Sequence, residues 1–406
     1  SGLILRRSGT ARSLNVYQVL PTVNTGLKNS DAHPLSIQVT TAAANRLLIY
    51  DEVDQTHKPG CVNQSGNCSG TDGMGRLGGV SAKTAGTSFQ ARILVTDQYY
   101  NHMGASSEPV VAAQTSDTHD NTESALGNFT LSGGSKVVNV TMISKGLQTL
   151  TAIKAGDESG DWNDLIDITV NAQTNSDPKK LLVILPGESS DPGSSTGKAS
   201  VPVTDTAAGS TITITVYAAD EFFNPYSAGD GITQPAVYLQ TSDPYDLPTA
   251  TVTLNDGTTN FKIVMYQAST QTVWARTATS DYNNYEEGLA PGTTNILINP
   301  DTAVKLQLLM PGELAKQGFS GGVDYSVSRT TGGKSGTPDV LVAGTTYNVT
   351  VNCVDKYFNR VSACEPTVDI EFSDDGSTDE NDENGLFVTK PLIAGATTFG
   401  VRFLRA

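Results

Sequence analysis

Three stretches of the sequence align without a gap: AGTSFQARILVTDQYYN at 85–101, AGSTITITVYAADEFFN at 208–224 and AGTTYNVTVNCVDKYFN at 343–359. Gly and Asp lie 11 positions apart in each copy, at 86 and 97, 209 and 220, and 344 and 355. In the third copy the apolar Tyr347, Val349, Val351 and Cys353 alternate with Asn348, Thr350 and Asn352, and the other copies alternate likewise. This period of two predicts a half-buried strand, with one face toward a core and the other toward water.

Each copy lies between two further landmarks. An apolar run that ends in a turn precedes it: NRLLIYDE at 45–52, KLLVILPGE at 180–188 and LQLLMPGE at 306–313. A polar turn follows it: TSDTHD at 115–120, TSDPYD at 241–246 and FSDDGSTD at 372–379. Paired strand patterns come next, and helical periodicity is close to absent. A tandem repeat of about seven short strands predicts an all-β chain of Greek-key sandwiches.

The composition fits this architecture and excludes several classes of function. Of 406 residues, 37% are hydrophobic, 17% are charged and 39 are Gly, which suits short strands and many turns. The formal net charge of −16 would repel a phosphate backbone, so we expect no nucleic-acid partner. No apolar run has the length of a membrane-spanning helix, and residues 1–10 contain no apolar core of signal-peptide length. We expect any targeting signal or anchor to lie outside this chain.

The four cysteines form two close pairs, Cys61 with Cys68 and Cys353 with Cys364. Local pairing of an even number favours disulfides, each of which would contribute about 2–3 kcal/mol. A zinc site is the competing interpretation, but neither pair has the C-x2-C spacing and no His lies close to the second pair. Disulfides imply an oxidising, extracellular compartment.

The order of the motifs resembles the immunoglobulin-like repeats of bacterial surface proteins, in the style of the invasin and intimin stalk domains. The resemblance covers essentially the whole chain, and it rests on LLVILPGE, AGSTITITVYAADEFFNP and TSDP, then a strand pair and the closing strand NILIN at 295–299. It implies immunoglobulin-like sandwiches in a linear array, which mostly serve as spacers. This chain departs from the family in having Tyr100, Phe223 and Phe358 where Gly is usual, so an aromatic patch becomes a hypothesis.

The repeat predicts where the modules begin and end. Complete modules are expected at 46–178 and 179–303, between the last strands of an incomplete module at 1–45 and the first strands of another at 304–406. TTFGVRFLRA at 397–406 matches a strand that two more strands follow in the other repeats, and the region before residue 40 matches those two strands. A sandwich without its last strands would expose part of its core and an unpaired edge.

Two interpretations of these ends stay open. In the first, the chain is a window of a longer array, and the covering strands lie in the same polypeptide. In the second, the amino-terminal strands of one copy complete the open module of the next, and this head-to-tail contact builds a filament. The residues predicted at such a polymer interface are Leu3, Leu5, Leu14, Val16, Phe399, Val401 and Phe403.

Catalytic patterns are poor, and we expect no enzymatic activity and no cofactor. The four histidines, at 33, 57, 102 and 119, form no spaced metal pair, and we interpret them as solvated loop residues. GTDGMGRLGG at 70–79 lacks the context of a phosphate-binding loop and is interpreted as a flexible loop. An acidic stretch could hold a carboxylate pair, but a charged loop is the default interpretation; its members are Asp157, Asp161, Asp164 and Asp167.

Calcium is the more serious hypothesis for an ion. Oxygen ligands are available from Asp374, Asp375, Asp379 and Asp382, although the EF-hand pattern is not matched and a solvated acidic loop is the competing interpretation. A second set of acids recurs just after the aligned strand, at 97, 220 and 355. We expect each to cap the N–H groups of its turn, with the Asn at 101, 224 or 359 across from it.

Aromatic pairs and sequons complete the surface features. The pairs lie at 99–100, 222–223 and 357–358, and one member of each is expected to pack inward and stiffen the array. If exposed, they could stack on sugar rings or join filaments laterally. Five sequons permit N-glycosylation, at Asn63, Asn67, Asn128, Asn139 and Asn348, and Asn348 is predicted on the water face of its strand.

These features together predict a structural subunit or shaft of an extracellular filament, stalk or coat. Its expected partners are further copies of itself or further repeats of the same polypeptide. The alternative is an adhesin that grips a glycan or a host receptor through its loops. The segment from Cys61 to Cys68 favours that alternative, because only one repeat has it.

Overall fold

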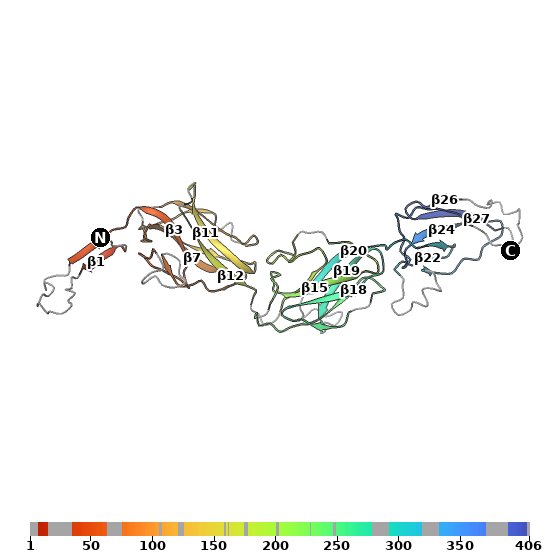
Figure 1. Cartoon of the computed structure of the whole chain (residues 1–406), viewed down its shortest axis with the longest axis horizontal. Coiled ribbons are helices and arrows are strands. Elements are labelled where there is room, and N and C mark those ends of the chain that lie inside the picture. Colours follow the sequence, from red (N-terminus) through yellow and green to blue (C-terminus); the bar gives the residue numbers. More distant parts are fainter. Residues whose placement is uncertain are drawn as a thin grey trace, which may run out of the picture. The chain divides into compact units, whose positions relative to one another are not determined.

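Figure 1 shows the computed structural model of the chain, in which every element of the described residues is a β-strand, as predicted. None of these residues belongs to a helix long and apolar enough to cross a bilayer. Two compact units divide the chain, Ser1–Thr174 with Pro192–Ser195, and Asn175–Asp191 with Thr196–Ala406. The structure describes 7–14, 35–62, 75–104, 108–120, 126–157, 160, 162–173, 178–199, 203–227, 229–246, 249–277, 292–318, 333–370 and 389–403.

The first sandwich packs two sheets of unequal size face to face. The smaller sheet is antiparallel with the order β10-β7-β3, and the larger has the order β6-β12-β11-β8-β9, with β6 parallel to β12. A short pair, β4 (Thr56–His57) and β5 (Arg76–Leu77), follows β3. The other strands are β3 (Ala44–Asp51), β6 (Lys83–Thr84), β7 (Phe89–Asp97), β8 (Val110–Thr115), β9 (Asn128–Thr130), β10 (Ser135–Val140), β11 (Gly146–Lys154) and β12 (Asn163–Asn171).

The second sandwich repeats this topology strand for strand. Its sheets have the orders β18-β15-β13 and β14-β20-β19-β16-β17, and β14 is again parallel to the closing strand β20. The strands are β13 (Lys180–Ile184), β14 (Thr206–Ala207), β15 (Thr211–Ala219), β16 (Ala236–Thr241), β17 (Val252–Thr253), β18 (Thr258–Val264), β19 (Thr270–Thr277) and β20 (Gly292–Asn299). The immunoglobulin-like sandwich is therefore a tandem unit, as the repeat predicted.

The third module has the smaller sheet, and little of the larger sheet lies among its described residues. Its antiparallel sheet has the order β21-β24-β27, and Figure 1 shows β24 and β27 in blue. Opposite it, the described residues form only the pair β25-β26, and β22-β23 corresponds to β4-β5. The strands are β21 (Lys305–Leu309), β22 (Leu314–Ala315), β23 (Lys334–Ser335), β24 (Thr346–Val354), β25 (Thr367–Val368), β26 (Lys390–Pro391) and β27 (Ala396–Arg402).

An amino-terminal hairpin precedes the first sandwich. It consists of β1 (Gly9–Leu14) and β2 (Leu35–Val39), which pair antiparallel with an irregularity between Gly9 and Arg12. By their place before an apolar run and its central strand, these two strands correspond to β19 and β20, which close the second sandwich. No other strand accompanies them in the part of the chain that is described before β3.

The cores follow the predicted alternation. In β15, Ile212, Ile214 and Val216 are buried while Thr211 and Thr213 are exposed, so one face of the strand meets the larger sheet. The third copy departs from the expectation at Asn352, which is buried instead of facing water. Its side chain donates a hydrogen bond of 3.2 Å to Gln307 on β21, which satisfies both polar groups away from solvent.

Candidate functional site

Each central strand, β7, β15 or β24, ends in a turn that an Asp side chain holds. In the third module, Tyr357 N, Asn359 N and Asn359 Nδ2 donate to the Asp355 carboxylate at 2.8–2.9 Å. Asp97 and Asp220 accept the corresponding bonds in their own turns. The predicted Asp cap, with Asn across from it, is confirmed, and these Asp and Asn side chains are buried in all three repeats.

An aromatic residue in the left-handed backbone region precedes each Asn. The φ angle is 60° at Tyr100, 59° at Phe223 and 64° at Phe358, a conformation that bulky residues keep only where packing enforces it. The packing is the same each time: a glycine of the facing loop lies against the ring, at Gly75, Gly197 or Gly333, where a Cβ would overlap it. A cation of the first strand lies over the ring, 4.8 Å away for Arg46, 3.9 Å for Lys180 and 3.5 Å for Lys305.

The positive φ at these three residues is a conformation that Gly adopts without strain, which agrees with the Gly that the resemblance led us to expect at this position. The geometry also confirms that one member of each aromatic pair packs inward. Tyr100, Phe223 and Phe358, the second residues of the three aromatic pairs, therefore pack within their own modules and do not form the exposed aromatic patch of the hypothesis.

The same Asp and Asn side chains also bind the neighbouring repeat, which the sequence reasoning missed. In the second unit, Asp301 N donates to the second carboxylate oxygen of Asp355, and Ala268 N donates to Asn359 Oδ1, both at 2.9 Å. Asn359 Nδ2 in turn donates to Tyr266 O at 2.8 Å. One buried pair therefore holds its own turn and, at the same time, the end of the second sandwich. The recurrence of both Asp and Asn in three copies was the available signal.

The amino-terminal hairpin is held to the first sandwich by the same bonds. Ala42 N donates to Asp97 Oδ2 and Ser8 N donates to Asn101 Oδ1, both at 2.9 Å. Burial opposes the charged form of Asp97, but hydrogen bonds from the Asn101 side chain and from the backbone at 101, 42 and 99 outweigh it, and the pKa is lowered. The hairpin thus stands where the end of a preceding sandwich would stand.

Tyr357 covers the joint between the second sandwich and the third module. Its ring lies on Gly209, in the turn before β15, where a Cβ would overlap the ring. The ring also meets Tyr266 edge-on, with the centroids 5.2 Å apart and the planes at 66°. The first member of this aromatic pair therefore packs between modules and stiffens the joint.

A second repeated carboxylate holds the turn that leads into the closing strands. The Asp117 carboxylate accepts bonds from Ile143 N at 2.6 Å and Ser144 N at 2.8 Å, and Asp243 holds the same turn in the second sandwich. Burial of Asp117 works against ionisation, but bonds from Ser144 and from the backbone lower its pKa. Asp374, a calcium candidate, aligns with these two residues in sequence.

The third module exposes a strip of what is core in the second sandwich. Lys180 and Lys305 lie at the same position in the strand register, each opposite the residue that precedes the Asp of the central strand. Leu306 and Leu308 of β21 therefore correspond to Leu181 and Val183 of β13. Leu181 and Val183 are 2% and 1% exposed, because β13 packs against β19 and β20. Leu306 and Leu308 are 52% and 41% exposed.

An edge of the third module is unpaired as well. In the second sandwich, β14 lies parallel to β20, and Ala208 N donates to Asn299 O at 2.8 Å. The corresponding residues, Leu341 and Val342, pair with no strand among the described residues, and Val342 is 63% exposed. The open strip and the open edge are the two surfaces that closing strands cover in a complete sandwich.

None of the residues predicted at the polymer interface is seen in the exposed strip. Some of them pack in the core of their own module, and the side chains of the others are not described. Phe399 and Val401 of β27 are buried in the core of their own module, and Phe403 packs partly buried against it, so Leu306 and Leu308 form the exposed strip instead. Leu14 lies in β1, and nothing is described of its side chain. Leu3, Leu5 and Val16 fall outside the described residues.

The predicted disulfides, glycosylation sites and calcium ligands lie partly within and partly outside the described residues. Cys353 and Cys364 form a disulfide with Cα atoms 6.1 Å apart, and Cys61 is disulfide-bonded too, whereas Cys68 lies outside the described residues. Asn128, Asn139 and Asn348 are exposed, and their glycosylation stays a prediction; Asn63 and Asn67 lie outside the described residues. The calcium candidates Asp374, Asp375, Asp379 and Asp382 lie outside them too, and no cluster that could hold a metal occurs within them.

The acidic stretch at 157–167 contains a structural residue instead of only loop charges. Asp164 lies in β12, where Arg76 approaches it to 2.8 Å and Ile49 N donates to it at 2.7 Å. Burial raises the pKa of Asp164, and Arg76 opposes this shift. Arg76 belongs to the Gly-rich stretch interpreted as a flexible loop, whose described part contains β5. This ion pair therefore ties β5 to the larger sheet.

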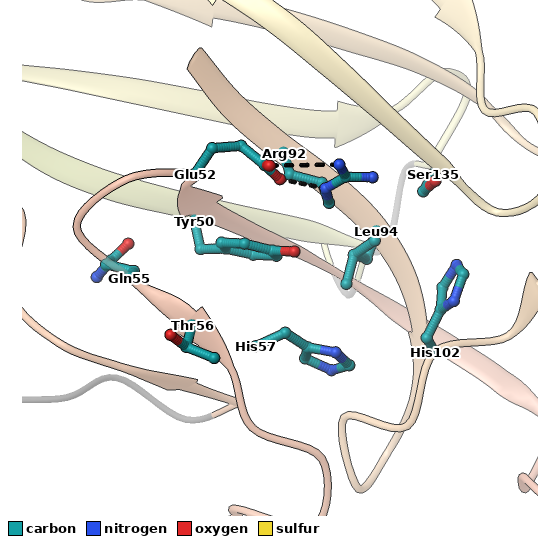
Figure 2. Close-up of a pocket in the computed structure, with 9 residues that line it drawn as sticks. All are labelled: Tyr50, Glu52, Gln55, Thr56, His57, Arg92, Leu94, His102 and Ser135. Carbon is teal, nitrogen blue, oxygen red and sulfur yellow. Dashed lines mark hydrogen bonds and ion pairs between the residues drawn. The ribbon is translucent and has the colours of Figure 1, made fainter. Parts of the chain in front are cut away.

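A cleft of about 450 Å³ lies in the first sandwich. Figure 2 shows the residues that line it, with Glu52 and Arg92 joined by an ion pair on one wall. Tyr50 stacks on His57, with ring centroids 6.3 Å apart. His57 lies in β4, and its Nε2 is 2.6 Å from Tyr100 O; burial is the main cause that lowers its pKa. The interpretation of His57 as a solvated loop residue is therefore wrong. The remaining lining residues are Gln55, Thr56, Leu94, His102 and Ser135.

Comparisons with known proteins give structural neighbours only. No protein-family profile and no curated protein matches the chain. The solved structure of the Escherichia coli adhesin FdeC is 11% identical with a TM-score of 0.24, and the match covers 80% of this chain and 87% of that one. Invasin, a bacterial integrin-binding protein, is 13% identical with a TM-score of 0.24, at 80% and 52% coverage.

A membrane-anchored protein of Corynebacterium diphtheriae is 11% identical with a TM-score of 0.23, at 81% and 83% coverage. Matches to enzymes are shorter: the β-glucuronidase 3 of Bacteroides uniformis is covered over 23% of its length, with a TM-score of 0.20. The solved structures that match this chain thus include a bacterial adhesin, a bacterial integrin-binding protein and a membrane-anchored protein.

Proposed function

We propose that the chain is a structural subunit of an extracellular filament or shaft, in which copies join head to tail by sharing strands. The amino-terminal hairpin, β1 and β2, of one copy covers the open strip of the third module of another. The observation that carries this proposal is the exposure of Leu306 and Leu308, at positions that are dry in both complete sandwiches. The Cys353–Cys364 disulfide supports an oxidising location outside the cell.

The hairpin offers the side chains that the strip lacks. The backbone N–H of Ala42 donates to Asp97 as that of Asp301 donates to Asp355, so Ala42 and Asp301 are equivalent positions. Counting back from them by the same number of residues, Ile37 and Val39 correspond to Ile296 and Ile298 of β20. The two isoleucines of β20 are each 1% exposed, whereas Ile37 and Val39 are only half-buried in the hairpin. Burying such a side chain contributes about 1.5–3 kcal/mol, so a joint that buries four of them is strongly favoured.

Assembly of the purified chain tests the proposal. We expect sedimentation velocity to show polymers that lengthen with concentration, and electron micrographs to show fibres. Leu308→Asp places a charge on the strip and is expected to abolish assembly. Ile393→Asp is the matched control, because Ile393 is 75% exposed in the turn between β26 and β27, away from the strip. A chain that stays monomeric at every concentration contradicts the proposal.

The cleft favours a second function, adhesion to a glycan or a receptor. An aromatic ring and a carboxylate–guanidinium pair beside it, as in Tyr50, Glu52 and Arg92, are groups that suit sugar hydroxyls. The cleft also lies in the repeat with the Cys61 segment. A glycan array decides: we expect binding that Arg92→Ala removes, and a negative array with the intact polymer contradicts this second function.

A further inference from the structure

We propose that the joint between two copies is sealed by Tyr99 of one copy, seated on Gly344 of the copy whose third module its hairpin completes. This inference rests on the proposed head-to-tail assembly and names the contact that locks it. It follows from the internal joint of the second unit, where both halves of the contact are present in one chain. The partner is a second copy of this chain.

The template is the seat of Tyr357 on Gly209. Gly209 has φ 79°, its N–H donates to Met265 O at 2.8 Å, and the ring of Tyr357 covers it. The position requires a glycine twice over, because the φ is positive and because a Cβ would occupy the place of the ring. The hydrogen bonds from the second sandwich to Asp355 and Asn359 hold the turn that carries Tyr357, and so position its ring over the Gly209 turn.

Gly344 is an empty copy of this seat. Its φ is 82°, its N–H donates to Phe403 O at 2.7 Å, and it precedes β24 as Gly209 precedes β15. An added Cβ at Gly344 would meet no atom within 4 Å, and the residue is exposed. The backbone of the seat is therefore formed in the third module, while no ring of the described residues fills it as Tyr357 fills the seat at Gly209.

Tyr99 is the matching ring. It follows Asp97 as Tyr357 follows Asp355, and its N–H donates to that Asp at 2.8 Å, as the N–H of Tyr357 does. Tyr99 and Gly344 are thus the two separate halves of one contact.

The hairpin brings these halves together. Ser8 and Ala42 attach it to Asn101 and Asp97 by the bonds that attach the second sandwich to the third module. When the hairpin of one copy fills the third module of another, those bonds fix that module on the first sandwich of the incoming copy. The Gly344 turn then lies beneath Tyr99, and the joint between copies repeats the joint within a copy.

Photo-cross-linking of the full chain tests the contact directly. A copy with p-benzoylphenylalanine in place of Tyr99 is mixed with an isotope-labelled copy, allowed to assemble and irradiated. We expect intermolecular cross-links whose labelled peptide contains 341–346. The same probe in place of Tyr245, in the turn after β16, is the control and is expected to give no such peptide. Cross-links from position 99 that avoid this region overturn the inference.

Substitutions at the two residues measure how much the contact contributes to the affinity of assembly. Gly344→Asn keeps a residue that tolerates a positive φ but fills the seat, and Gly229→Asn is the matched control, with φ 95° and open space at its Cβ. We expect Gly344→Asn and Tyr99→Ala each to raise the dissociation constant of assembly about tenfold, the double variant no further, and Gly229→Asn to change nothing. Unchanged assembly of Tyr99→Ala overturns the seat alone, whereas a wild-type chain that does not assemble overturns the proposed function as well.

Discussion

The second sandwich and the third module are built alike over their first strands and differ in what covers them. Both have a lysine over a ring at positive φ, and the same turn before the central strand. Yet Val183 is 1% exposed and Leu308, its counterpart, is 41% exposed. The three-stranded sheet therefore forms from its own repeat, while the dryness of its inner face depends on closing strands.

The largest expected effect is the difference in stability loss when a charge is placed at Val183 and at Leu308. Val183→Asp places a charge in a dry core and should destabilise the second sandwich by about 3–5 kcal/mol, enough to unfold it at modest urea concentration. Leu308→Asp should cost the isolated chain less than about 1 kcal/mol, because water already reaches the site. Urea titrations of both variants below the concentration of assembly check this, and equal losses contradict the difference.

The disulfide of the third module gives the next largest effect. Replacing Cys353 and Cys364 by Ala opens a loop closed across 11 positions, which should destabilise the module by about 3 kcal/mol. The second sandwich has no cysteine and should unfold unchanged. Hydrogen exchange resolved by segment measures both in one sample. Equal loss of protection in β15 and β24 would show that the two do not unfold separately.

Acid should weaken the third module through Glu313. Burial opposes the charged form of this group, but Met310 N at 2.8 Å and Lys334 at 2.9 Å lower its pKa. A carboxyl whose folded pKa is lowered stabilises the fold above its unfolded pKa, near 4.3, and this contribution disappears as the pH falls through the folded value. Urea midpoints from pH 7 to pH 3 measure the loss. Glu313→Gln should flatten this pH dependence, and an unaltered slope contradicts the assignment.

The smallest expected effect should be equal in the two regions. Lys180→Ala and Lys305→Ala each remove a cation from an aromatic face, which should cost about 0.5–1 kcal/mol. Thermal unfolding measures both. Because these contacts belong to the smaller sheet, which both regions share, a cost more than twofold larger in one of them would show that the sheets are not equivalent.

Period-two alternation and the Gly-to-Asp spacing were enough to predict the strands and the repeat. Both are local signals, since the facing sheet leaves its mark on every second residue of a strand such as β15. The Asp cap was predictable for the same reason, because it binds N–H groups only two and four residues on.

Contacts between distant segments were not predictable from a single sequence. Asn352 alternates as a surface residue, but Gln307 on the neighbouring strand satisfies it in the interior. Asp164 lies among loop-like charges, but Arg76 from 88 positions away ties it to the sheet. Phe399 and Val401 were expected at an interface, yet their own module buries them. In each case the partner that decides the role is remote in the chain.

The most direct test of shared strands is the chemical accessibility of the strip itself. Leu308→Cys supplies a thiol there, and Ile393→Cys supplies one at an exposed position away from the strip. Both should react quickly with a maleimide in dilute chains. On assembly, the account predicts that the thiol at 308 is protected at least tenfold while the thiol at 393 stays reactive. A thiol at 308 that reacts equally fast in the polymer would contradict it.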